Sequence, residues 1–139
     1  MLLLAASLLL APRAHAEPRL TGPAAPLVAG AALTLTLTAD RKPVFVDGCA
    51  AVDLERREGE RWVPVEPTIA CDGSAVARAI PKEQTFSLAT PGVGEFRAVV
   101  AWGLGCVEGR PFALAACAAL GVARTASFQV VAPPPPAQR

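Results

Sequence analysis

The chain has 139 residues, and its 13 basic and 12 acidic side chains leave a net charge of only +1. This balance excludes a general electrostatic hold on nucleic acid or anionic lipid, because each of these requires a basic surface. The 14 prolines and 11 glycines, scattered among short apolar runs, are typical of a turn-rich β protein of one domain.

The N-terminus carries the pattern of a signal peptide. A short apolar run covers residues 2–10, and Ala14-His15-Ala16 supplies the small-x-small sequence that signal peptidase recognises. We expect cleavage after Ala16, with residues 1–16 removed and the mature protein periplasmic or secreted. The alternative is a buried N-terminal strand or helix. The run is too short to span a bilayer, which takes about 20 residues.

Residues 17–30, rich in Pro and Gly, are predicted to be an extended lead-in. In the stretch that begins at Ala31, leucine and threonine alternate strictly over residues 33–38, which predicts a half-buried strand. A polar turn at residues 40–43 leads to a second, shorter strand over 44–46.

A β-hairpin is predicted between Cys49 and Cys71, with its tip at Glu58-Gly59. This centre sets Leu54 opposite Val63, and by the same register Val52 opposite Val65. The four aliphatic side chains then share one face, as a half-buried antiparallel pair requires.

Further strands are expected after the hairpin. A weak strand over 75–80 and another over 84–89 precede GEFRAVVAW, in which Phe96, Ala98, Val100 and Trp102 share a face. That strand is apolar on part of its other face as well, which indicates a central place in its sheet. The stretch 103–121 is predicted to be a long loop, with one or two helical turns in ALAACAALGVA. The closing strand covers 125–131, with Ala126, Phe128 and Val130 on one face.

The tail, residues 132–139, contains four consecutive prolines and is predicted to be polyproline II or disordered. A proline-binding partner could use it; a frayed terminus or spacer is the simpler interpretation. The expected domain is therefore residues 31–131.

The four cysteines all follow the predicted cleavage site. An even number of cysteines in an oxidising compartment indicates two disulfides, and the local pairs Cys49–Cys71 and Cys106–Cys117 are favoured among three pairings. A four-thiolate zinc site would need closely spaced C-x-x-C pairs, which the sequence lacks.

Short strands separated by turn signals predict an immunoglobulin-like antiparallel β-sandwich of 7–8 strands. Residues 31–131, with LTLTLTADRKPV, the LERREGERWVPV hairpin and TPGVGEFRAVVAW, resemble bacterial secreted immunoglobulin-like (Big/BsuPI-like) domains. Such domains carry a leucine-x-arginine, Gly, x-Trp-Val-x-Val hairpin and a Pro-Gly-x-Tyr-Arg strand. Phe96 stands where that pattern has Tyr, so Phe96 contributes packing and no phenol hydrogen bond. The resemblance also implies one activity, proteinase inhibition of the BsuPI type.

Catalytic chemistry is poorly represented in the expected mature chain. Its one histidine, His15, would leave with the signal peptide, and oxidised cysteines are not nucleophiles. The hairpin carboxylates, Glu55, Glu58, Glu60 and Glu66, are interleaved with arginines, as in a solvated, self-neutralised surface. Neither a cofactor motif nor the ligand spacing of a calcium or other metal site is present.

We therefore expect a monomeric, non-enzymatic module, without a membrane span or nucleic-acid partner, that binds a protein or cell-envelope component or acts structurally. The candidate partner-binding residues are Trp62, Arg56, Arg57 and Arg61, since aromatic and arginine side chains dominate interface energetics. The alternative for Trp62 is a second-face core residue packed under arginine stems. The alternative function is a protease inhibitor that presents residues 56–61 or 106–117 as its exposed loop.

Overall fold

The computed structural model describes residues 17–40, 43–66, 71, 75–113 and 116–138. These residues form β-strands joined by turns and loops, and they contain no α-helix. The strands are β1 (Arg19–Thr21), β2 (Leu27–Val28), β3 (Ala32–Thr38), β4 (Val44–Asp47), β5 (Val52–Glu58), β6 (Arg61–Pro64), β7 (Ala77–Ile80), β8 (Glu83–Ala89), β9 (Gly94–Leu104), β10 (Ala119–Arg124) and β11 (Phe128–Val131).

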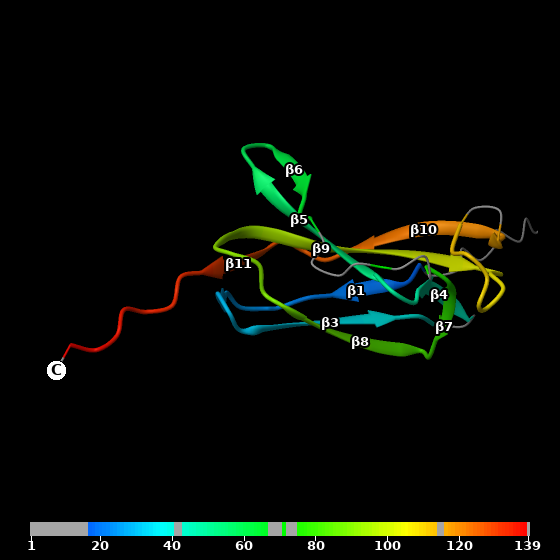
Figure 1. Ribbon diagram of the computed structural model, residues 1–139, viewed down its shortest axis with the longest axis horizontal. Coiled ribbons are helices and arrows are strands. Elements are labelled where there is room, and N and C mark those ends of the chain that lie inside the picture. Colours follow the sequence, from blue (N-terminus) through cyan, green and yellow to red (C-terminus); the bar gives the residue numbers. More distant parts are fainter. Residues whose placement is uncertain (1–16, 41–42, 67–70, 72–74, 114–115, 139) are drawn as a thin grey trace, which may run out of the picture.

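Two sheets face one another. The smaller sheet has 3 strands in the order β1-β3-β8, and the larger has 8 strands built around β9. Figure 1 shows the smaller sheet beneath the larger one. Neighbouring strands are antiparallel except for the short β2–β11 pair, which is parallel. The predicted fold class, an immunoglobulin-like antiparallel β-sandwich with two local disulfides, is confirmed, although the described strands outnumber the 7–8 expected.

The core lies between the sheets and follows the period-two pattern of the sequence. In β3, Leu33, Leu35 and Leu37 are completely buried, while the threonines between them are exposed or half-buried. On the facing sheet, the inward side chains of β9 are Phe96, Ala98, Val100 and Trp102, all buried. Alternation along these two strands therefore predicts correctly which side chains form the centre of the core.

Strand β9 is the central strand of the larger sheet, as its two-sided apolar pattern predicted. Its residue Phe96 pairs with both β5 and β11, and Leu104 pairs with both β4 and β10. Since a residue pairs with one strand on each side, β10 and β11 share one edge of β9, and β5 and β4 share the other.

Two predictions around the second cysteine pair are wrong. Residues 103–121 are not one long loop, because β9 continues to Leu104 and β10 begins at Ala119. The part of ALAACAALGVA from Ala119 onward is strand, not helix; residues 114–115 lie outside the described residues. The physical reason is Trp102, whose ring lies where a Cβ on Gly121 would be, so a glycine completes the pairing across the strands.

The two ends of the domain also differ from expectation. The closing strand begins at Phe128, and Ala126 is exposed instead of sharing the inward face with Phe128 and Val130. The lead-in contributes β1 and β2, because Leu20 is buried and pairs with Leu37 of β3. Residues 132–138 have no regular structure and extend away from the sandwich (Figure 1).

The hairpin forms with a register shifted from the predicted one. Strands β5 and β6 pair Glu58 with Arg61, so the turn is Gly59-Glu60, one residue later than expected. Gly59 has a φ of 64°, which suits a two-residue turn with glycine in its first position. Leu54 accepts a hydrogen bond from the N–H of Val65 rather than facing Val63. Moving the turn by one residue changes each cross-strand partner by two residues. The alternation of side chains therefore stays intact, and the aliphatic side chains still share one face.

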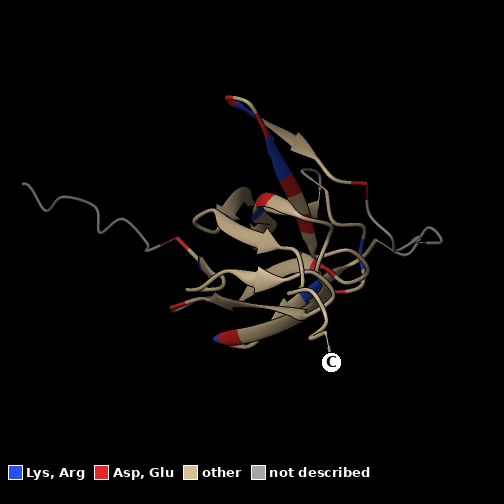
Figure 2. Ribbon diagram, turned by 90° about the vertical axis from the view of Figure 1, so that its left-hand side faces the viewer, with Lys and Arg blue, Asp and Glu red and all other residues tan. Residues whose placement is uncertain are grey.

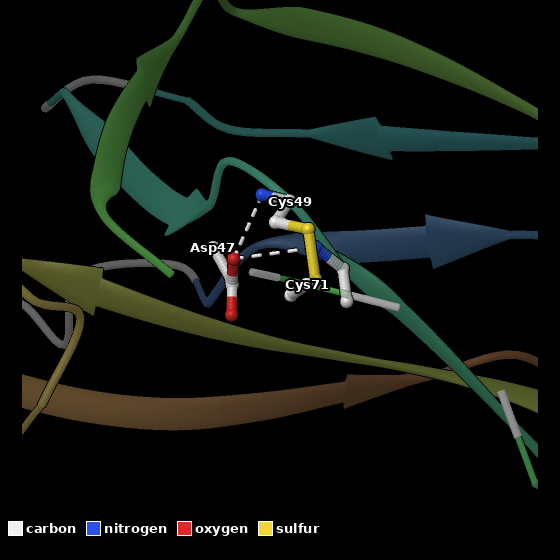
Figure 3. The surroundings of a disulfide bond; sticks show 4 residues. Asp47, Cys49 and Cys71 are labelled. Atoms are coloured by element: carbon white, nitrogen blue, oxygen red, sulfur yellow. Dashed lines mark hydrogen bonds between the residues drawn. A yellow bond between two sulfur atoms is a disulfide. The ribbon is translucent and has the colours of Figure 1, made fainter. Parts of the chain in front are cut away.

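Both predicted disulfides are present, and the described residues contain no free cysteine. Cys49–Cys71 joins the start of the hairpin segment to its end. Beside it, the Asp47 carboxylate accepts hydrogen bonds from the N–H groups of Cys49, at 2.8 Å, and Ala50, at 3.2 Å (Figure 3). These hydrogen bonds satisfy backbone N–H groups at the bend between the end of β4 and the start of β5.

Candidate functional site

The β5–β6 hairpin projects beyond the sandwich (Figure 1). The first part of β5, from Val52 to Arg56, pairs with β9, whereas the strand partner of β6 within the described part of the chain is β5 alone. The tip, residues 57–61, is exposed. Acidic and basic segments alternate along the hairpin up to its tip (Figure 2). The hairpin is thus a two-stranded protrusion whose base is part of the larger sheet.

Trp62 lies on the outward face of the hairpin and is half-buried between arginine side chains. The guanidinium carbon of Arg97 is 4.5 Å from the centre of the indole ring, and that of Arg57 is 6.0 Å away. A guanidinium at such a distance is attracted to the negative face of the aromatic ring. Trp62 is therefore neither a freely exposed anchor nor a core residue, since cationic groups cover part of its ring.

Carboxylates hold these two arginines in place. Arg97 Nε donates to Glu55 Oε1 at 2.7 Å, and both side chains are largely shielded from solvent. Arg57 lies 3.6 Å from Glu95 and also donates a hydrogen bond from Nε to the carbonyl of Gly59. A guanidinium that is paired at its edge can still stack through its face, so the carboxylates orient the arginines against Trp62.

Arg56 and Arg61 belong to the other face of the hairpin. The guanidinium carbon of Arg56 is 5.2 Å from the ring centre of buried Phe96. Its Nε is buried and has no hydrogen-bond partner among the described residues. The structure thus separates the four candidate residues into Trp62 with Arg57 on the outward face and Arg56 with Arg61 on the inward one, because alternate residues of a strand point to opposite faces.

Asp53 is the one described side chain whose pKa is clearly displaced. Partial burial raises the pKa of its carboxyl above the ordinary value, and the nearby charges of Asp47 and Glu55 raise it further. These three acids lie near the base of the hairpin, where β4 bends into β5. Asp47 and Asp53 make the base acidic, whereas Glu55 is paired with Arg97 in the outward cluster.

Sequence reasoning found Trp62 and Arg57 but missed Arg97 and Glu95, which complete the outward cluster. These two residues come from β9, and the hydrogen bond from Arg97 to Glu55 joins residues 42 apart in the chain. The alternation of β9 placed Arg97 outside the core. Its contact with Trp62 depends on how β5 pairs with β9, which no local pattern reveals.

The segment enclosed by Cys106 and Cys117 is tied to the rest of the sheet. The N–H of Ala77 donates to the carbonyl of Arg110, and the N–H of Gly109 donates to the carbonyl of Ala77. Phe112 likewise donates to the carbonyl of Ala75. The middle of this segment therefore uses its backbone groups in pairing beside β7.

The described residues contain no group of three or more His, Cys, Asp or Glu side chains that could hold a metal ion. Within the same part of the chain, no helix has the length and apolarity needed to cross a bilayer. Comparisons with protein-family models, with curated proteins and with solved structures found no match to this chain.

Proposed function

We propose that this protein is an exported, non-enzymatic module of the bacterial envelope that binds a protein or another envelope component through its projecting hairpin. The observation that supports this proposal is the Trp62 cluster, in which the guanidinium groups of Arg57 and Arg97 lie against an indole ring on the outer face of the projecting hairpin. A preorganised aromatic and arginine surface reduces the entropy lost on binding.

The charges of the cluster favour selective contact over bulk attraction. Arg57 and Arg97 are already paired with Glu95 and Glu55, so the surface offers little net charge. Its exposed part combines the remaining area of the Trp62 ring with guanidinium and carboxylate groups at fixed positions. Such a surface suits a partner that supplies both an apolar side chain and complementary polar groups.

Export is supported by the N-terminal sequence and by the disulfides. The protein has two disulfides. Such bonds persist in oxidising compartments and are rare in the bacterial cytosol. Expression of the full chain in a bacterial host, followed by fractionation and intact-mass measurement, tests this part of the proposal. We expect oxidised protein that begins at Glu17 in the periplasmic or extracellular fraction; unprocessed protein in the cytosol would contradict export.

Binding is tested by capture from native envelope and secreted fractions, with surface-immobilised protein and quantitative mass spectrometry. We expect a partner that is retained by the wild type, lost by Trp62→Ala and weakened by Arg57→Gln. The matched control is Val107→Ala, which alters an exposed side chain in the Cys106–Cys117 segment. A partner retained equally by all four proteins, or no specific partner at all, would refute the role of the hairpin.

The inhibitor alternative has weaker support. Protease inhibitors of the loop type present an extended segment to the protease, but the hairpin turn contains only Gly59 and Glu60. The Cys106–Cys117 segment, in turn, uses Gly109, Arg110 and Phe112 in hydrogen bonds to residues near β7. Titration against serine, cysteine and metalloproteases tests the alternative directly, and stoichiometric inhibition of any of them would favour it over the hairpin proposal.

A further inference from the structure

One flank of the sandwich is open. Between β8 of the smaller sheet and the β4–β5–β7 side of the larger sheet lies a groove of about 690 Å³. Apolar side chains from both sheets line it, and they are only partly buried, unlike the leucines of β3 and the inward residues of β9. Six of these lining residues are Val52, Leu54, Val65, Ile80, Phe86 and Leu88. The two sheets therefore leave part of their shared apolar interior accessible along this side.

Strand β8 borders the groove, and its outer edge has no strand partner among the described residues; the Gln84 side-chain amide donates to the Thr85 carbonyl there at 3.1 Å. Among the described residues its one strand partner is β3. Two hydrogen bonds flank the β3–β8 ladder. The Thr90 N–H donates to the Ala31 carbonyl and the Ala39 N–H donates to the Lys82 carbonyl, so these two cross-strand pairs are of the hydrogen-bonded kind. In an antiparallel ladder bonded and non-bonded pairs alternate, so even-numbered residues of β8 bond to β3. The N–H and C=O groups of Thr85, Ser87 and Ala89 consequently point to the free edge.

The neighbouring exposed edge, that of β6, is protected in a way that the β8 edge is not. The Val65 N–H donates to the Leu54 carbonyl, so the backbone N–H and C=O groups of Val63 and Val65 point to β5. The nitrogen of the intervening Pro64 points to the free edge. A proline there has no N–H to offer an incoming strand, which is a common protection of edge strands. Strand β8, with the sequence EQTFSLA, contains no proline.

The charges beside the groove are mainly acidic. Of the described residues that line it, Asp47, Asp53 and Glu66 are acidic and Arg78 is basic. Partial burial raises the pKa of Asp53 and the charges of Asp47 and Glu55 raise it further, so negative charges lie close together at this end of the groove. A cationic side chain near this end of the groove would relieve their mutual repulsion.

We propose that the groove binds an extended segment of a partner protein, which adds as a strand to the free edge of β8. The backbone of that segment pairs with Thr85, Ser87 and Ala89, its alternate apolar side chains enter the groove, and a Lys or Arg faces the acidic end. Strand addition of this kind combines backbone hydrogen bonds with pockets for every second side chain. This surface is separate from the hairpin cluster, so the two proposals stand or fall independently.

The chain's own tail does not fit this description. Residues 133–136 are four prolines, which have no N–H groups with which to bond to β8. An extended segment is favoured over a small molecule because the groove runs beside a strand of 7 residues, about 24 Å at 3.4 Å per residue. The acidic rim favours a basic segment over an acidic one.

The first test uses a capped peptide of about nine residues, long enough to cover β8, in which valine and threonine alternate and a lysine stands at each end. Its binding to the full, oxidised protein is followed by amide NMR spectra and hydrogen exchange. We expect the N–H groups of Thr85, Ser87 and Ala89 to exchange quickly in the free protein and slowly with peptide. The N–H groups of Phe86 and Leu88 should be protected in both states. Slow exchange at Ser87 in the free monomer would overturn the proposal, because the edge would already be covered.

The second test removes the edge donor without removing the pairing with β3. Ser87→Pro deletes an N–H that points away from β3, so the variant should fold, and peptide binding should weaken at least about tenfold. The matched control, Ser87→Ala, keeps the N–H and should bind as the wild type does. A Ser87→Pro variant that folds and binds the peptide normally would refute strand addition.

Two altered peptides complete the design. Methylation of alternate backbone nitrogens should abolish binding, and replacement of both lysines with glutamate should weaken it about tenfold or more. Equal binding of the glutamate peptide would contradict the charge argument. Dimerisation of the free protein that Ser87→Pro abolishes would identify a second copy as the occupant and overturn the partner-protein proposal.

Discussion

Replacement of Thr125 by valine should destabilise the protein, because Thr125 completes the hydrogen bonding of the central strand. Thr125 lies between β10 and β11 and is 6% exposed. Its backbone N–H donates to the carbonyl of Ala98, and its hydroxyl oxygen accepts from the N–H of Ala98, both at 3.0 Å. Ala98 also faces Leu54 at the base of the hairpin. The threonine side chain thus acts as a missing strand residue on the edge opposite β5.

The expected loss in the free energy of unfolding follows from the buried N–H group that the valine leaves without an acceptor. Thr125→Val keeps the shape of the side chain but removes the acceptor, so the buried N–H of Ala98 loses its partner at a cost of about 1–3 kcal/mol. For a domain of this size, that loss corresponds to a fall in Tm of roughly 4–12 °C. It is a large part of a total stability that is usually about 5–15 kcal/mol.

Urea unfolding followed by tryptophan fluorescence would measure the loss. Thr125→Ser retains the acceptor and should lose less, and Thr34→Val, at an exposed position of β3, should change stability by no more than about 0.5 kcal/mol. Hydrogen exchange should accelerate selectively at Ala98 in the valine variant. A Thr125→Val protein within about 0.5 kcal/mol of the wild type would show that the N–H of Ala98 does not depend on this hydroxyl.

Two further predictions follow from the first disulfide and from Asp53. The paired Cys49→Ser and Cys71→Ser replacements should cost about 3 kcal/mol in urea unfolding, because the bond closes a loop with a sequence separation of 22; a loss below about 1 kcal/mol would contradict this account. The raised pKa of Asp53 means that the folded state binds more protons than the unfolded chain between the ordinary value of 3.8 and the folded-state pKa. Stability should therefore fall as the pH rises through that interval, and Asp53→Asn should flatten the fall in urea midpoints measured from about pH 3 to pH 7; an unchanged pH profile would show that Asp53 is not its source.

The fold could be predicted wherever apolar and polar residues alternate along a strand in step with its buried and exposed faces. Leucine and threonine alternate along β3 because one face is buried and the other is not, and the pattern in β9 likewise indicates its central place. Strand β10 could not be found in this way. Gly121 fits the space left by the ring of Trp102, and that requirement comes from a neighbouring strand, not from the local sequence.

The candidate site was predictable only in part, for a related reason. Trp62 and Arg57 stand out in the hairpin sequence, but Arg97 reaches them from β9 because Glu55 pairs with Arg97 across the sheet. The turn position determines the hairpin register, and Gly59 can occupy either position of a two-residue turn. The free edge of β8 depends on strand order in the smaller sheet, which periodicity does not specify.

The order of the cysteines has a consequence for how the protein reaches its oxidised state. The first cysteine is bonded to the second and the third to the fourth, as Cys49–Cys71 and Cys106–Cys117. When a chain enters an oxidising compartment from its N-terminus, Cys71 is the first thiol that Cys49 can meet, and this pair can close before Cys106 arrives. An oxidant that joins thiols in order of arrival therefore makes both native bonds directly, with no thiol–disulfide exchange needed to correct them.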